Sequence, residues 1–494
     1  MKAFKKQIML IAVCAVICVS VFVSWKLNQP DNADDAMDKL TSAQQGEDDG
    51  SKVLGEAEFV NSTSEYFSSA RLNRQETRDE AVRILNEIIA NESSTEEDRA
   101  VAQEKLLALS DAADAEGRIE NLVKAKGFSE CVAMIGDLWH ANPDEEPMGT
   151  STVGSSEACM LGGLGMLFRW KKLAKDAGID IYTSQRPNLV ISAGYQVCWE
   201  KFCRYWDIEM RLVPLEKDHL SLNMDTVMDY VDDHTIGITA ILGITYTGKF
   251  DDVKKLDELV EAYNQEHPKL PIRIHVDGAS GGMFAPFVEP DLVWDFQLKN
   301  VWSINCSGHK YGLVYPGIGW VVWRSKEALP EDLIFWVSYL GGEEATMAIN
   351  FSRSASQIVG QYYVLMRNGF QGFKEIQERT LDVARYLALE LDEMGIFEIY
   401  EDASHIPIVC WGLKDDANVE WSLYDLSDRL RMSGWLVPAY PMPADMQDTT
   451  VQRVVARADF SMQLAIKLVE DMKKEIDTLN KAKFVTGNTQ GVIR

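Results

Sequence analysis

The apolar positions between about Cys131 and residue 360 follow two alternating periods. Short apolar, β-branched runs are typical of buried strands, and longer stretches with apolar residues every three or four positions are typical of helices. The runs lie at 188–193, 208–213, 236–242, 272–276 and 301–304, and the helical stretches include 156–176 and 251–264. This alternation predicts an α/β domain over 131–360, with a largely parallel sheet and helices on both faces.

Beyond residue 360 the pattern changes to long amphipathic helices. They are expected at 361–396, 421–433 and 460–481, around two short β-rich runs at 397–401 and 407–412. This arrangement predicts a smaller α+β domain over 361–494 that closes the chain. The 494 residues are enough for two or three domains, each with its own core.

The first 27 residues have the pattern of a membrane segment. Three lysines among the first six residues precede an uncharged run from Ile8 to Trp25, and Lys26 follows it. A helix of this length just crosses a bilayer core, so the sequence predicts a single-pass transmembrane anchor over 1–27, in the membrane through residues 8–25. A secretory signal peptide is the alternative, but no small-x-small cleavage pattern follows the run. The positive-inside rule then places the N-terminus in the cytoplasm and the rest of the chain outside.

Residues 28–130 are first polar and then helical in pattern. The segment 28–70 is acidic and polar (DNADDAMDKLTSAQQGEDDGSK), which predicts a solvated tether. Over 71–130 apolar residues recur at helical spacing in RDEAVRILNEIIA, and again after Ser94, which forms a capping-box pattern with Glu97. The sequence therefore predicts a helical hairpin over 71–130.

The charge and the cysteines limit the partners of the chain. The formal net charge is −27, which leaves no basic surface for nucleic acid. Eight scattered cysteines form no CxxC pair, and there are only seven histidines and no HExxH motif, so we expect no metal site. We interpret the cysteines as buried free thiols of a reducing compartment.

Three short motifs next to predicted strands indicate a cofactor site. Lys310 ends SINCSGHK, where small neighbours would let a flat cofactor approach the amine. Asp277 ends the run HVD and could pair with a protonated ring nitrogen, and Ser155 and Ser156 open a helix whose free N–H groups can hold a phosphate. Taken singly, these residues could be a solvated loop lysine, a helix N-cap and ordinary capping serines. Because strand ends meet at one edge of a parallel sheet, we expect them to lie together.

Longer segments around these motifs closely resemble the glutamate decarboxylases. They are DLWHANPDEEPMGTSTVGSSEACMLGG, QVCWEKFCRYW, GITYTG, HVDGASGGMFAPFVEPDLVWDF, SINCSGHKYGLVYPGIGWVVWR, YLGG and INFSR. The resemblance covers about 131–480 of the chain. It implies the aspartate-aminotransferase-like fold (fold type I), pyridoxal 5'-phosphate as the cofactor, and a homodimer with its sites at the subunit interface.

The resemblance also implies roles for the residues of the three motifs. Lys310 would hold the cofactor as a Schiff base, and Asp277 would pair with its pyridine nitrogen. Ser155, Ser156 and His309 would hold the phosphate. Lys310 and Asp277 are therefore the expected catalytic residues.

Five further positions match residues of the family's site. Ser352 would reach the phosphate from the other subunit, and Gln196 would stack on the ring. Ala279 is small enough to lie beneath the ring, and Thr245 would lie beside its 3-hydroxyl or the carboxylate. Arg453 would bind a substrate carboxylate, for which a guanidinium fork is suited.

The activity implied by the resemblance is conversion of L-glutamate to 4-aminobutyrate and CO2, with uptake of one proton. The residues by themselves indicate a pyridoxal-phosphate enzyme and leave open a decarboxylase for another amino acid. Arg453 favours a substrate with a carboxylate to bind.

Residues 1–130 resemble a different family, the stage III sporulation proteins of the AH type, which are single-pass membrane proteins of the mother-cell-to-forespore channel. The resemblance rests on the anchor, the tether and YFSSARLNRQETRDEAVRILNEIIANESSTEEDRAVAQEKLLALSDAADAEGRIENLVKAKGFSECV. The two resemblances meet near Cys131, and each is partial, so we interpret the chain as a fusion. The decarboxylase-like part resembles cytoplasmic proteins. The alternative function is a membrane-anchored interaction protein fused to an inactive decarboxylase fragment.

Overall fold

A computed structural model describes residues 127–181, 185–338 and 344–482, with short stretches between 82 and 106. The chain divides into two units, Met1–Asp111 and Ala112–Arg494. In the first unit, residues 82–90 and 99–103 are helical, as the hairpin pattern predicts. The described residues contain no helix that is both long and apolar enough to cross a membrane, and the predicted anchor and tether lie outside them.

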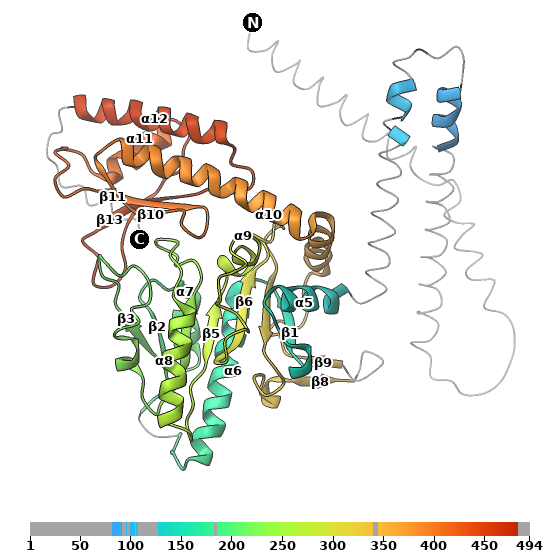
Figure 1. The fold of residues 1–494 in the computed structure, drawn as a ribbon, viewed down its shortest axis with the longest axis vertical. Helices are drawn as coiled ribbons and strands as arrows, with labels where there is room; N and C mark the ends of the chain where they lie inside the picture. The colour runs from blue at the N-terminus through green and yellow to red at the C-terminus, as the bar shows by residue number, and fades with distance from the viewer. Residues whose placement is uncertain are drawn as a thin grey trace, which may run out of the picture. The chain divides into compact units, whose positions relative to one another are not determined.

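The larger part of the second unit is built on a seven-stranded sheet (Figure 1). In sheet order its strands are β1 (Met148–Thr152), β7 (Gly319–Trp323), β6 (Val301–Ser307), β5 (Ile274–Asp277), β4 (Thr235–Ile241), β2 (Asn188–Ser192) and β3 (Glu209–Val213). Strand β7 runs antiparallel to both of its neighbours, and the remaining pairs are parallel. This arrangement confirms the predicted α/β class with a mostly parallel sheet.

Helices cover both faces of this sheet. On one face lie α6 (Ser155–Asp176) and α7 (Val197–Tyr205), and on the other lie α5 (Gly127–Leu138), α8 (Val253–Glu266), α9 (Ala285–Val288) and the first part of α10 (Ala355–Glu393). Short 3₁₀ turns are η1 (Pro143–Glu145), η2 (Val227–Tyr230), η3 (Gly281–Met283) and η4 (Glu331–Leu333).

Alternate residues of each strand enter opposite cores. In β2, Val190 packs on the α8 side, whereas Leu189 and Ile191 pack on the α6 side. Because both faces are buried, the strands are apolar at consecutive positions, which is why they appear in the sequence as continuous runs.

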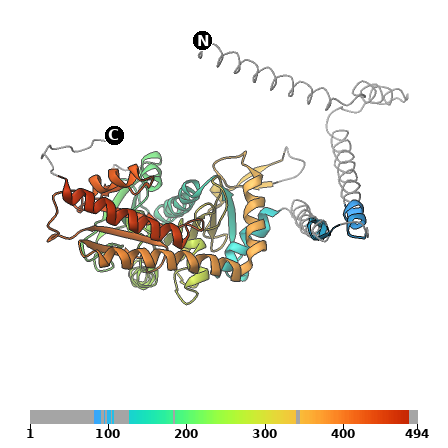
Figure 2. The same cartoon turned by 90° about the horizontal axis from the view of Figure 1, so that it is seen from above.

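The C-terminal part is a smaller α+β domain. Its antiparallel sheet has the order β10 (Phe397–Asp402), β11 (Ile408–Leu413), β13 (Thr450–Val455) and β12 (Ala439–Pro441). The second part of α10, with α11 (Leu423–Met432) and α12 (Met462–Lys481), packs with this sheet, and α10 and α12 run side by side (Figures 1 and 2). A separate ribbon pairs β8 (Phe335–Val337) with β9 (Glu344–Thr346).

Helix α10 joins the two domains and changes direction at one residue. Gly369 has φ +60° and ψ −173°, outside the helical region, which a residue without a Cβ adopts at little cost. The helix begins at Ala355, so it crosses the predicted domain boundary at residue 360. Its first part packs on the large sheet and its second part on the small one.

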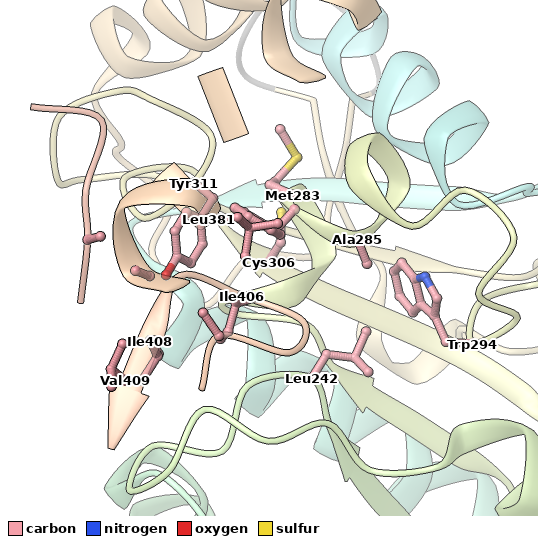
Figure 3. Close-up of a cluster of buried hydrophobic side chains, with 14 of the residues drawn as sticks. Leu242, Met283, Ala285, Trp294, Cys306, Tyr311, Leu381, Ile406, Ile408 and Val409 are labelled. Carbon is pink, nitrogen blue, oxygen red and sulfur yellow. The ribbon is translucent and has the colours of Figure 1, made fainter. Parts of the chain in front are cut away.

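One apolar cluster is continuous across the two domains. Figure 3 shows side chains from the large domain, such as Leu242 and Tyr311, in the same cluster as Ile406 and Ile408 of the small domain. The small domain is therefore packed against the end of the sheet at which β4 and β6 finish.

Candidate functional site

The predicted site residues gather at the carboxyl edge of the large sheet. A cavity of about 230 Å³ opens there. It is lined by Gly154, Ser155, Ser156, Cys159, Gln196, Cys198, Ile241, Gly243, Thr245, Asp277, Ala279, His309 and Lys310. Most of these residues lie in the segments that follow the ends of β1, β2, β4, β5 and β6, which is where parallel sheets bind their ligands.

Asp277 is buried at the end of β5, with only 3% of its surface exposed. Its Oδ2 accepts a hydrogen bond from Trp199 Nε1 at 2.8 Å, and its Oδ1 accepts from Asn305 Nδ2 and the Ala279 N–H, each at 3.1 Å. These three partners are N–H donors, so both oxygens act as acceptors. A buried carboxylate held in this way is a suitable partner for a protonated ring nitrogen.

Lys310 lies in the loop after β6, with its amine at the cavity. Its Nζ donates to Ser280 Oγ at 3.2 Å. Helix α10 holds the loop from behind, because Gln361 Nε2 donates to the Gly312 carbonyl and Gln377 Nε2 donates to the Tyr311 carbonyl, both at 2.9 Å. Two buried glutamines therefore fix the backbone that presents the amine.

The N-terminus of α6 opens directly into the cavity. Its N-cap is Gly154, and no side chain of the described residues caps the first turn, which leaves N–H groups at Ser155 and Ser156 for a ligand. Strand β7 passes close behind, because a Cβ on Gly319 would lie 2.4 Å from the Gly154 carbonyl carbon. Only glycine permits this approach, so Gly319 sets the position of the helix N-terminus.

His309 precedes the lysine and also lines the cavity. Its Nδ1 is buried without a hydrogen-bond partner among the described residues. Burial, followed by the neighbouring charge of Lys310, lowers the pKa of His309 below its ordinary value. Arg457 contributes a smaller effect of the same sign.

The other predicted residues divide between those that line the cavity and those that do not. Gln196, Thr245 and Ala279 line it, and the Gln196 side chain also caps α7 by accepting from the Cys198 N–H at 2.7 Å. Ser352 and Arg453 are not among the lining residues. Ser352 is exposed, and Arg453 lies on β13 with its guanidinium 6.0 Å from the ring centre of Tyr440.

Several residues at the site were not singled out from the sequence. They are Trp199 and Asn305, which bond to Asp277, Ser280, which bonds to Lys310, and the buried thiols of Cys159 and Cys198. Burial raises the pKa of Cys159 well above its ordinary value. The sequence offered one signal for Asn305: it lies in an apolar strand, where a polar side chain needs a partner.

The residues present fit a flat, phosphorylated aromatic aldehyde. The uncapped α6 N-terminus suits the phosphate, the Lys310 amine suits the aldehyde, and the Asp277 carboxylate suits a ring nitrogen. The partnerless Nδ1 of His309 gives one more polar group for a ligand.

The comparisons with known proteins identify this class. Residues 129–414 match the model of the pyridoxal-dependent decarboxylase conserved domain. The chain is 60% identical over 362 residues to glutamate decarboxylase beta of Listeria innocua, covering 73% of this chain and 78% of that protein. It is 62% identical over 357 residues to a glutamate decarboxylase of Lactococcus lactis, covering 72% and 76%. The chain belongs to the family of pyridoxal-dependent decarboxylases, which use pyridoxal phosphate.

Solved structures agree with this assignment. A glutamate decarboxylase of Lactobacillus brevis superposes with a TM-score of 0.71 at 48% identity, covering 90% of this chain and 97% of that one. A sphingosine-1-phosphate lyase of Burkholderia pseudomallei, at 18% identity and a TM-score of 0.59, shares the fold.

The N-terminal part matches a second family. Residues 5–138 match the model of the SpoIIIAH-like proteins. The two matches overlap only at 129–138, within α5, which confirms that the resemblances meet near Cys131. In α5 the side chains of Cys131 and Ile135 are fully buried in the core of the large domain.

Proposed function

We propose that this protein decarboxylates L-glutamate to 4-aminobutyrate and CO2. The observation that supports this most directly is the cavity that brings Lys310 and Asp277 together, in a chain 60–62% identical to glutamate decarboxylases. The net reaction takes up one proton for each CO2 released.

Lys310 and Asp277 perform the central roles. When bound, pyridoxal phosphate supplies a ring that accepts the electron pair left by the departing carboxylate. Lys310 Nζ would hold the aldehyde carbon, and as a free amine it would be placed to deliver a proton to the substrate. Asp277 would hold the proton on the ring nitrogen, and its three N–H donors keep the carboxylate aligned.

The phosphate and the ring are held by residues around the cavity rim. Ser155 and Ser156 would bind the phosphate through the start of α6, with His309 beside them. Gln196 would stack on the ring, and Ala279 is small enough to lie beneath it; both line the cavity.

The substrate carboxylates require a positive side chain close by, because a protein with a net charge of −27 gives an anionic substrate no long-range attraction. Arg453, which does not line the cavity, would bind one substrate carboxylate, and Thr245, which does, would lie on the cofactor's 3-hydroxyl or carboxylate side. In the described residues no acidic side chain pairs with Arg453, and its charge acts on the neighbouring Tyr311.

A second copy of the chain completes the site. Large apolar side chains are exposed between β8 and the first part of α10, including Phe335 (61%), Trp336 (67%) and Phe351 (49%). Exposed apolar surface of this kind is typical of subunit interfaces. Ser352 follows Phe351, is exposed and lies outside its own cavity, so it is free to reach the phosphate site of a partner subunit.

The activity is tested by CO2 release from carboxyl-labelled glutamate, with pyridoxal phosphate supplied. Lys310→Ala is expected to abolish release, whereas Lys254→Ala, an exposed lysine on α8, is expected to retain it. Aspartate as a competing substrate tests the specificity. No release from folded wild-type protein would contradict the proposal and favour the inactive-fragment alternative.

The N-terminal match supports a location for the enzyme. Residues 5–138 are similar to SpoIIIAH-like proteins, and we propose that residues 8–25 anchor the chain in a membrane. Fractionation of tagged protein with and without residues 1–30 tests this. Recovery of both forms in the soluble fraction would contradict the anchor without affecting the enzyme.

A further inference from the structure

The register between β5 and β6 aligns four polar side chains behind the cofactor cavity. His275 lies beside Ser303, and Asp277 lies beside Asn305, on adjacent parallel strands. Because strand side chains alternate between faces, residues two apart point to the same side. His275 meets α6 and α7 there, since its ring lies 5.3 Å from that of Trp199, and a Cβ on Gly162 would lie 2.3 Å from His275 Cε1.

The hydrogen bonds of this group have one consistent direction. Asn305 must turn its amide nitrogen to Asp277, because a carboxylate accepts, and its Oδ1 then accepts from His275 Nε2 at 2.7 Å. Nε2 therefore bears the hydrogen, and Nδ1 accepts from the Ser303 hydroxyl at 2.7 Å. The chain of donors runs from Ser303 through His275 and Asn305 to Asp277.

The surroundings keep this arrangement in place. His275, Asn305 and Trp199 have no exposed surface. Burial lowers the pKa of His275 to about 4 despite the nearby Asp277, so the ring is neutral near pH 7. If the Asn305 amide were reversed, its Oδ1 would face the Asp277 carboxylate oxygen with no hydrogen between them. Two facing acceptors are costly in a site without water.

We propose that His275, acting through Asn305, and Trp199 are positioning residues that fix the Asp277 carboxylate for the ring nitrogen of the cofactor. His275 holds the Asn305 amide in the one orientation that donates to Oδ1, and Trp199 holds Oδ2. The inference deepens the proposed function and rests on it to the extent that the cavity binds pyridoxal phosphate.

The test measures cofactor binding and the bound cofactor's visible absorbance against pH, using purified full-length protein. Asn305→Leu and His275→Leu are each expected to raise the cofactor dissociation constant at least about tenfold and to shift the pH midpoint of the absorbance change. His275→Gln, which retains an N–H at the Nε2 position, is expected to restore both. Because His275 acts through Asn305, the double Leu variant should be no worse than Asn305→Leu.

Two variants separate positioning from general destabilisation. Asn300→Ala removes a fully buried side chain immediately before β6 that bonds to Glu261 and Asn264, so it should lower stability and leave the absorbance midpoint unchanged. Trp199→Phe removes the indole donor while keeping an aromatic ring in the buried position, and should shift the midpoint in a protein that still folds.

The outcomes separate the positioning role of these residues from the binding of the cofactor. Wild-type affinity and midpoint in Asn305→Leu, His275→Leu and Trp199→Phe would overturn the positioning role and leave the enzyme assignment intact. Additive losses in the double variant would overturn the action of His275 through Asn305. Failure of wild-type protein to bind pyridoxal phosphate would overturn both the cofactor site and this inference.

Discussion

His405 and Glu289 join the two domains, with His405 Nδ1 2.9 Å from Glu289 Oε2. The imidazole also stacks on Phe250 of the large domain, with ring centres 4.6 Å apart. His405 lies in the loop between β10 and β11, and Glu289 directly follows α9. Beside them Lys249 Nζ lies 2.8 Å from the buried Glu401 carboxylate, which is another ion pair between the domains.

The His405–Glu289 pair predicts a pH-dependent stability. The hydrogen bond that His405 donates to Glu289 raises the pKa of His405 above its ordinary value of 6.5. The pair's stabilisation is therefore fully present below that value and is lost as the pH rises through the raised value. Glu289→Gln should lower the free energy of unfolding by less than about 1 kcal/mol at about pH 5.5, because both groups are partly exposed, and by less still at about pH 8.5. Thermal unfolding midpoints at the two pH values measure this.

A second variant checks the source of this effect. In a His405→Gln background, Glu289→Gln should produce no further pH-dependent change. A difference that persists in this background would contradict the assignment of the effect to His405.

Asp277→Asn is expected to lower kcat by about a hundredfold or more, because the neutral amide cannot balance a protonated ring nitrogen. It also turns an amide N–H toward one of the donors that now bond to the carboxylate. Steady-state kinetics, with the cofactor absorbance as a loading check, measure this. Asp291→Asn, at an exposed site, is the matched control, and equal losses in both would contradict the role of Asp277.

Gly319→Ala is expected to weaken cofactor binding and to destabilise the fold by about 1–3 kcal/mol, because the new methyl would collide with the Gly154 backbone. The measurements are denaturant unfolding and equilibrium binding of pyridoxal phosphate. Gly360→Ala, within α10 and with the nearest atom to the added Cβ 3.9 Å away, should leave cofactor binding unchanged and should not destabilise the fold.

Arg453→Gln is expected to raise the KM for glutamate by about tenfold to a hundredfold while cofactor binding stays unchanged. Arg453→Lys should recover part of the loss, since it restores charge without the planar fork. Arg457→Gln is the comparison, because Arg457 also acts on the site through His309. A larger KM effect at Arg457 than at Arg453 would transfer the substrate role to Arg457.

Much of the fold was predictable because its strands are buried on both faces. The runs at 188–193, 208–213 and 236–242 became β2, β3 and β4 within a few residues. Strand β1 was not predicted, since MGTST has no apolar run. Strand β7 was not predicted either, and its reversed direction follows only from its pairing with β1 and β6.

The chain alone determined which residues could do the chemistry: an amine at Lys310, a carboxylate at Asp277 and hydroxyls at Ser155 and Ser156, each next to a strand or at a helix start. Local pattern suffices there, because parallel strands bring their ends to one edge. The tertiary structure decided what surrounds them. That Asn305 lies beside Asp277, that Trp199 reaches it from α7 and that Gly319 passes behind Gly154 depend on register and helix packing. These contacts join segments far apart in the chain, so no local periodicity specifies them.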